Sequence, residues 1–211
     1  MLTSFRPRFK TLLEIFEAST KRYPDRPLFG TKRRGVWVWT TYREFAEKVA
    51  KIRGGLAHLG VGKGDFVAII SNNRPEWAIA AYATYGRGAV LVPMYESQSP
   101  SEWAYIIRDC GARVCFVANS KIQSDLIKAC ISIGIKDQIS HIISFEERED
   151  GLSWSQLELK GLANPVDGLL VQPHDLACLL YTSGTTGKPK GVRLSHANLA
   201  MNVSAMHEVF P

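Results

Sequence analysis

The chain has 211 residues, of which 45% are hydrophobic and 22% are charged, a composition typical of a globular protein with one core of fair size or two small ones. No apolar run approaches the roughly 20 residues that a helix needs to span a bilayer, so a membrane-spanning protein is not expected. The formal net charge of +6 comes from residues 1–44, where ten Lys and Arg residues outnumber four Asp and Glu residues.

This basic front segment could contact an anionic membrane surface or a nucleic acid. We favour a simpler interpretation, in which its charges form a solvated face and the tip of a hairpin, and we expect no nucleic-acid partner. A peripheral membrane contact stays open. The N-terminus carries charges where a secretory signal would be apolar, and no two of the four cysteines form a C-x-x-C pair. We therefore expect a cytoplasmic protein, with membrane association left open, whose thiols are reduced and buried.

The first elements are predicted to be a helix, a hairpin and a second helix. Residues 11–23 carry apolar side chains at helical spacing, and a proline follows them. Short strands at 28–29 and 36–39 flank a basic turn, which predicts the hairpin. Thr41 and Glu44 have the spacing of a capping box, so the second helix is predicted to begin there.

The stretch 60–65, Gly-Val-Gly-Lys-Gly-Asp, looks superficially like a phosphate-binding loop. We reject that function because the stretch follows a helix and precedes the apolar strand 66–70. This order is typical of a helix-to-strand turn, in which the first glycine ends the helix.

From that strand onward the chain alternates between strands and helices. Further strands are predicted at 89–92, 114–118 and 139–143. The helices between them are predicted to begin at Asn73, at Ser99 with Glu102, and at Ser120 with Gln123. Continuous apolar strands separated by helices indicate an α/β fold, with a layered, strand-helix alternating parallel sheet covered on both faces.

A connector at 161–173 contains Pro, Gly and Asp, and we interpret it as a subdomain boundary. Residues 1–160 are then a first α/β subdomain with the N-terminal helix and hairpin, and residues 161–211 are the start of a second subdomain. Beyond the connector, strands are predicted at 177–181 and 192–194, and an amphipathic helix at 195–210.

The most distinctive stretch is Tyr181–Gly191 (YTSGTTGKPKG), which combines three glycines with hydroxyl side chains and two lysines. Such a loop leaves backbone N–H groups free and adds hydroxyl and cationic donors, which is the chemistry of a phosphate-binding loop. A flexible surface loop is the alternative, and it is less favoured because apolar runs anchor both ends. The common loop of kinases and hydrolases is excluded because only two residues separate Gly184 from Gly187, and Pro189 stands where a magnesium-binding hydroxyl should be.

Residues 181–192 closely resemble the phosphate-binding signature of the adenylate-forming superfamily, which includes acyl-CoA synthetases, firefly luciferase and the adenylation domains of peptide synthetases. The resemblance covers nearly the whole chain and includes the stretches 64–69 (GDFVAI), 73–77 (NRPEW), 88–95 (GAVLVPMY) and 195–199 (SHANL). The NRPEW run and the segment 95–102 (YESQSPSE) look most like long-chain fatty acyl-CoA synthetases.

The resemblance implies a ligase that forms an acyl adenylate from a fatty acid and ATP, releases pyrophosphate and transfers the acyl group to coenzyme A. It implies ATP, Mg²⁺ and coenzyme A as co-substrates. It also implies that the ATP phosphates are held by Thr182, Ser183, Gly184, Thr185, Thr186, Gly187 and Lys190. Lys188 corresponds to a more variable position in the family and carries less weight.

Members of the family extend several hundred residues beyond the part that this chain matches. We therefore expect an incomplete synthetase N-terminal domain, inactive on its own, with no assignable catalytic residue and no metal ligand. The alternative is a non-catalytic chain that binds a partner carrying the remaining parts, or a truncated reading frame. The helical pair His207-Glu208 is not matched to the acyl-pocket histidine that the family carries later.

Overall fold

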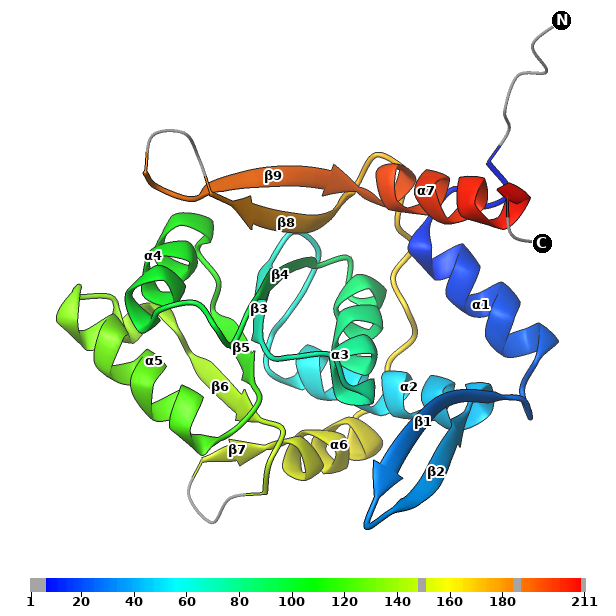
Figure 1. Ribbon diagram of the computed structural model, residues 1–211, viewed down its shortest axis with the longest axis horizontal. Coiled ribbons are helices and arrows are strands. Elements are labelled where there is room, and N and C mark those ends of the chain that lie inside the picture. The colour runs from blue at the N-terminus through cyan, green and yellow to red at the C-terminus, as the bar shows by residue number, and fades with distance from the viewer. Residues whose placement is uncertain (1–6, 148–150, 184–186, 210–211) are drawn as a thin grey trace, which may run out of the picture.

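The computed structural model describes residues 7–147, 151–183 and 187–209, which form a large sheet with helices on both faces and a separate two-stranded hairpin (Figure 1). The helices are α1 (Leu12–Arg22), α2 (Tyr42–His58), α3 (Pro75–Gly86), α4 (Pro100–Cys110), α5 (Ser120–Ser132), the short 3₁₀ helix η1 (Lys136–Gln138), α6 (Trp154–Ala163) and α7 (His196–Val209). The strands are β1 (Pro27–Arg33), β2 (Val36–Thr41), β3 (Phe66–Ile70), β4 (Val90–Met94), β5 (Val114–Val117), β6 (His141–Ser144), β7 (Leu152–Ser153), β8 (Leu176–Thr182) and β9 (Lys190–Ser195).

The seven-stranded sheet has the order β7-β6-β5-β3-β4-β8-β9. Its neighbouring strands are parallel except for β8 and β9, which pair antiparallel. Alternate residues of β3 face two different cores. Val67 and Ile69 belong to the core that includes α2, α3 and α6, whereas Ala68 and Ile70 belong to the core that includes α4 and α5. The predicted α/β fold with a parallel sheet covered on both faces is confirmed.

Reciprocal capping boxes begin three of the described helices: two were predicted, and the third, Ser153 with Gln156 at the start of α6, was not. At the start of α2 the Thr41 side chain accepts a hydrogen bond from the Glu44 N–H, and the Glu44 carboxylate accepts one from the Thr41 N–H. Ser99 and Glu102 do the same at the start of α4. Each box satisfies N–H groups that the first helical turn leaves without partners.

Two other predicted caps are wrong by one residue. Arg74, not Asn73, precedes α3 in extended conformation, and it makes no side-chain cap because a guanidinium has no atom that accepts a hydrogen bond. Asn119, not Ser120, caps α5. Its side-chain oxygen accepts a hydrogen bond from the N–H three residues further on at 2.9 Å, and Ser120 is already helical.

Helices α2 and α6 cross at very short distance because glycines occupy the crossing. Gly54, Gly55 and Gly161 are all buried there. A Cβ atom added to Gly161 would lie 1.6 Å from the Lys51 carbonyl oxygen, and one added to Gly55 would lie 2.6 Å from the Leu157 carbonyl oxygen. The two backbones therefore pack directly on each other.

The predicted connector at 161–173 begins inside α6, which continues to Ala163. After the connector, β8 joins the same sheet beside β4. The proposed subdomains 1–160 and 161–211 therefore both contribute strands to one sheet, and the position of the boundary between them stays a prediction.

The four cysteines are free thiols. Cys115, Cys130 and Cys178 are buried, and Cys110 is half-buried. Burial raises the pKa of Cys110 and of Cys178 to about 11, so these thiols stay protonated and unreactive near neutral pH.

Helix α7 buries a narrow stripe rather than a broad apolar face. His196, Ala200 and Ser204 are its buried residues and follow one another at steps of four. Its larger apolar side chains, Met201, Val203, Met206 and Val209, are exposed. A helix is therefore present where one was predicted, but the expected amphipathic pattern is wrong: Leu199 packs against the core, whereas the four larger side chains just named are exposed.

His196, the first residue of α7, is completely buried. Its ring packs edge-to-face against Tyr85, with ring centres 5.5 Å apart. Among the described residues, neither ring nitrogen of His196 has a hydrogen-bond partner. Burial lowers the pKa of this imidazole to about 4, only partly opposed by the Asp175 carboxylate, so the ring is neutral at physiological pH.

Candidate functional site

The stretch predicted to bind phosphate is the turn of the hairpin formed by β8 and β9. Tyr181 lies opposite Gly191, and Thr182 lies opposite Lys190. Nearer its base, β8 pairs with β4 at Cys178. The hairpin is thus attached to the sheet through its base, and its free end, where β8 ends and β9 begins, lies beside α4 (Figure 1). The predicted extended segments on both sides of the turn are confirmed.

Four of the seven predicted phosphate-binding residues are described and exposed at this turn: Thr182, Ser183, Gly187 and Lys190. The other three, Gly184, Thr185 and Thr186, lie outside the described residues. Gly187 has φ of 81°, a left-handed conformation that glycine adopts without steric cost. The turn thus brings hydroxyl, N–H and ammonium donors together at the surface, and their role in phosphate binding stays a prediction.

Helix α4 holds both arms of the hairpin, a contact that the sequence analysis missed. The Tyr181 hydroxyl on β8 donates a hydrogen bond to Asp109 at 2.5 Å. The Tyr105 hydroxyl donates one to the Pro189 carbonyl, before β9, at 3.3 Å. Tyr105 and Asp109 are four residues apart and share one face of α4. That spacing shows that the two side chains share a face of the helix, but not which segment they contact.

The side chains of β8 also cover the glycine on β9. A Cβ atom added to Gly191 would lie 2.9 Å from Leu179 and 3.3 Å from the Tyr181 ring. Burial of the Tyr181 hydroxyl, together with its hydrogen bond to the Asp109 carboxylate, raises the pKa of this tyrosine above its ordinary value. The phenol therefore stays protonated and donates to Asp109.

We expect Tyr181→Phe to lower the free energy of unfolding by about 1 kcal/mol, because it removes a partly solvated hydrogen bond to a carboxylate. Urea denaturation followed by circular dichroism measures the change, and hydrogen exchange should show faster exchange in β8 and β9. Tyr95→Phe is the matched control, since the Tyr95 side chain is exposed and its hydroxyl has no hydrogen-bond partner among the described residues. Equal stability of wild type and Tyr181→Phe would show that this bond does not hold the hairpin.

A cavity of about 590 Å³ lies where β3 and β4 end, beside β8. Its lining residues are Ser71, Asn72, Asn73, Trp77, Pro93, Met94, Tyr95 and Leu180. Two stretches that carry the family resemblance, 73–77 and 88–95, therefore meet at this cavity. Ligands of open α/β sheets bind at the carboxyl ends of the strands. The cavity is the second part of the candidate site.

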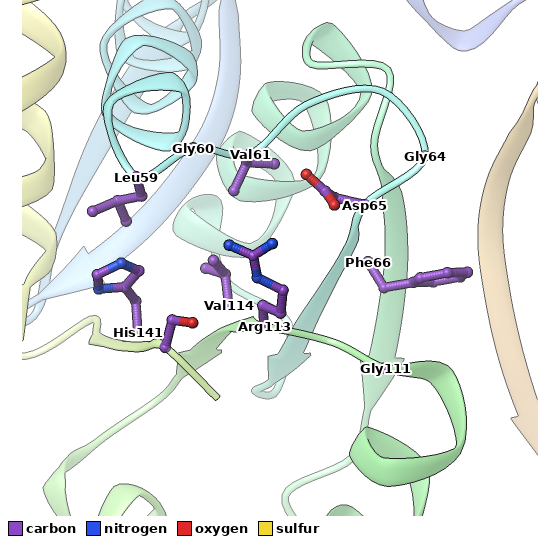
Figure 2. A pocket seen from close by; sticks show the side chains of 11 residues that line it. Leu59, Gly60, Val61, Gly64, Asp65, Phe66, Gly111, Arg113, Val114 and His141 are labelled. Atoms are coloured by element: carbon purple, nitrogen blue, oxygen red, sulfur yellow. The ribbon is translucent and has the colours of Figure 1, made fainter. Parts of the chain in front are cut away.

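A smaller cavity of about 70 Å³ lies where β3, β5 and β6 begin, and the loop 60–65 lines it (Figure 2). The Gly62 N–H donates a hydrogen bond to the Asp65 carboxylate of the same loop at 2.8 Å. Figure 2 shows the Arg113 side chain extending into the space between this loop and β5. The loop thus uses one of its N–H groups to bind its own carboxylate. This agrees with the interpretation of 60–65 as a helix-to-strand turn and not as a phosphate site.

In the part of the chain that the structure describes, no group of three or more His, Cys, Asp and Glu residues is arranged to hold a metal ion. The candidate site consists of the hairpin turn and the cavity at the ends of β3 and β4.

Comparison with known proteins gives a family model described as AMP-binding enzyme, which matches residues 16–211. The peroxisomal long chain acyl-CoA synthetase 6 of Arabidopsis thaliana is 31% identical over 211 aligned residues, which cover 94% of this chain and 30% of the relative. The long-chain-fatty-acid–CoA ligase ACSBG2 of Gallus gallus is 32% identical, with 90% of this chain and 26% of the relative covered. The chain thus spans less than a third of the length of these relatives.

Solved structures agree with this result. The anthranilate CoA ligase AuaEII, in complex with anthranoyl-AMP, superimposes with a TM-score of 0.77 at 26% identity, over 93% of this chain and 37% of that chain. Apo MbtA of Mycobacterium smegmatis shares the fold with a TM-score of 0.81 at 23% identity, over 96% of this chain and 37% of that chain. The sheet with its glycine-rich hairpin, the family model and these relatives lead to one conclusion: this chain belongs to the adenylate-forming family of AMP-binding enzymes, and its sequence relatives include long-chain acyl-CoA synthetases.

Proposed function

We propose that this chain supplies the ATP-phosphate-binding hairpin and one wall of the substrate site of a long-chain fatty acid–CoA ligase. In the reaction, the fatty acid carboxylate attacks the α-phosphate of ATP and pyrophosphate leaves. The thiol of coenzyme A then takes the acyl group and AMP leaves. The names of the relatives support the long-chain acid, and the family supports ATP and coenzyme A as co-substrates.

The observation that carries the proposal is the hairpin turn, with Thr182, Ser183, Gly187 and Lys190 exposed at its free end while α4 holds both of its arms. Hydroxyl and N–H donors can follow the phosphate oxygens as pyrophosphate departs, and the Lys190 ammonium can offset the developing negative charge. Mg²⁺ would accompany ATP as its counter-ion. Glycines in the turn allow it to close over the phosphates and to reopen for product release.

The complete reaction needs parts that the family's members carry beyond the matched region, either in the same polypeptide or in a complementing chain. We propose a cytoplasmic location for the ligase, with peripheral membrane association. Incubated alone with ATP, Mg²⁺, coenzyme A and a C16 fatty acid, the chain should form no acyl-CoA. Measurable turnover would show that the chain carries more of the catalytic machinery than we propose.

A second candidate is a non-catalytic chain that acts by binding a partner. The exposed apolar side chains of α7, which include Met201, Met206 and Val209, favour such a contact. This candidate is distinguished by mixing the chain with a polypeptide that carries the later segments of a synthetase. Restored acyl-CoA formation supports a complementing role in catalysis, whereas binding without activity supports the non-catalytic role.

The phosphate-binding role is tested by comparing the two lysines of the hairpin. Both Lys188 and Lys190 are exposed and carry one positive charge, but the family resemblance assigns only Lys190 to the phosphates. We expect Lys190→Ala to weaken binding of Mg-ATP and of pyrophosphate about tenfold, which corresponds to one lost charge-assisted contact. Lys188→Ala should change either affinity by less than about threefold. Titration followed by ³¹P NMR measures both constants. Equal losses in the two variants would indicate non-specific charge attraction and would contradict the assignment.

A further inference from the structure

The hairpin β1–β2 exposes four consecutive apolar residues, an unusual feature for the surface of a globular protein. Val36, Trp37, Val38 and Trp39 are 67%, 57%, 46% and 57% exposed. In Figure 1 this hairpin lies at the lower right, apart from the seven-stranded sheet and from the turn of β8–β9 at the upper left. Such a patch, remote from the turn of β8–β9, indicates a separate contact surface.

The base of the hairpin is firmly attached to the core. Phe29 packs edge-to-face against Phe45 of α2, with ring centres 5.5 Å apart. The Tyr42 N–H donates a hydrogen bond to the Arg26 carbonyl at 3.1 Å, which ties the start of α2 to the segment before β1. The exposed tip is therefore carried on a fixed support.

The two faces of the hairpin differ. Thr31, Arg33, Val38 and Thr40 line a cavity shared with α2, α3 and α6, so they face inward. Trp37 and Trp39 alternate with Val38 along β2 and lie on the outer face. Their rings stack 6.1 Å apart, and both lie over Gly30, whose missing side chain makes room for them. The outer face is thus a preformed aromatic surface.

Two basic side chains lie beside this aromatic surface, and the hairpin sequence contains no acidic residue. Lys32 lies opposite Trp37 in the strand register, and Arg34 follows at the turn. Residues 26–43 contain no Asp or Glu. Within the described ranges, neither Lys32 nor Arg34 forms an ion pair, so both charges are available to an anionic partner.

We propose that the outer face of the β1–β2 hairpin binds the surface of an anionic lipid bilayer. Tryptophan side chains favour the membrane–water interface, where the ring is shielded and the N–H remains hydrated. Lys32 and Arg34 meet the lipid headgroups, and Val36 adds apolar contact at the turn. Among the described helices none is long and apolar enough to cross a membrane, so the contact is peripheral. This proposal does not depend on the proposed ligase activity.

A nucleic acid is the less favoured partner for the same surface. Stacked tryptophans and cations also bind single strands. However, residues 26–43 contain no Asn, Gln, Asp or Glu to read base edges, and two of the four exposed residues are valines, which cannot stack on bases. A lipid surface uses both tryptophans and Val36 at the turn, whereas a nucleic acid can stack only on the tryptophans.

The test is sedimentation of the full chain with vesicles of phosphatidylcholine alone or with one quarter phosphatidylglycerol, at low and high salt. We expect binding to the anionic vesicles only, weakened by salt. Trp37→Ala/Trp39→Ala should reduce binding at least tenfold, and Lys32→Gln/Arg34→Gln about fivefold for each cation removed. The matched controls, Leu159→Ala/Leu162→Ala and Lys128→Gln/Lys136→Gln, change equally exposed residues elsewhere and should bind as wild type does.

A second measurement distinguishes the loss of the tryptophan contact from misfolding of the alanine variant. Brominated lipids should quench tryptophan fluorescence of the wild type, and Trp37→Phe/Trp39→Phe should lose that quenching while it still binds vesicles. Absence of vesicle binding by the wild type, or equal binding by all variants, would overturn the proposal. Binding of a single-stranded oligonucleotide without vesicle binding would overturn it in favour of nucleic acid. Self-association abolished by the tryptophan changes, without vesicle binding, would overturn it in favour of a second copy.

Discussion

Gly161→Ala should lower the free energy of unfolding by more than about 4 kcal/mol and leave the chain largely unfolded at 37 °C. The new Cβ atom would lie 1.6 Å from the Lys51 carbonyl oxygen and 2.6 Å from the Gly55 N–H nitrogen. Both are backbone atoms of α2, so no side-chain rotation can relieve the overlap. Helices α2 and α6 would have to separate, which opens the core that they share with β3.

Urea denaturation followed by circular dichroism measures the loss, and soluble yield at two temperatures gives an independent readout. Gly62→Ala is the matched control. Its Cβ atom would meet only the Asp65 carboxylate, at 3.9 Å, so we expect a change below about 0.5 kcal/mol. A Gly161→Ala variant that unfolds cooperatively within about 1 kcal/mol of the wild type would show that α2 and α6 are not so closely packed.

Lowering the pH from 6.5 to about 4 should reduce stability by roughly 2 to 3 kcal/mol through His196 alone. Burial depresses the pKa of this imidazole to about 4 in the folded chain, from an ordinary value of 6.5. The unfolded chain therefore binds a proton between these two pH values that the folded chain does not. The stabilisation that comes from keeping the His196 ring neutral is complete above pH 6.5. It is progressively lost as the pH falls from 6.5 to about 4.

The measurement is the free energy of unfolding in urea at several pH values between 4 and 7.5. His196→Leu replaces the ring with an apolar side chain and should flatten the profile by the same 2 to 3 kcal/mol, since it removes the titrating group. His207→Gln, which changes an exposed histidine on the same helix, is the matched control. Identical slopes for His196→Leu and wild type would contradict the assignment to His196.

Sequence rules predicted the features that depend on neighbouring residues. The capping boxes at Thr41 and Ser99 were found because both partners lie within four positions of each other. The same rules misplaced the start of α5, because Asn119 and Ser120 are both good caps and only the backbone conformation decides between them. The stretch predicted to bind phosphate was visible because its composition differs from that of a core strand.

Contacts between distant parts of the chain were not predictable in this way. Asp109 and Tyr181 are separated by 72 positions, and no local pattern pairs them. Glycine is a poor helix former, so the sequence alone gives no reason for glycines inside α2 and α6. In the structure, these glycines allow the two helices to approach each other closely. The burial of His196 also depends on tertiary packing, against Tyr85, and its position at the start of a helix gave no sign of it.

The strand order has a consequence for synthesis of the chain on the ribosome. β3, β4 and β5 are the first strands of the large sheet to be made, and they are adjacent at its centre. The inner part of the sheet can therefore form while the rest is still being translated, and the outer strands then add on either side. The hairpin with the turn predicted to bind phosphate, at one edge, joins after these strands, when the surface to which it attaches has already folded.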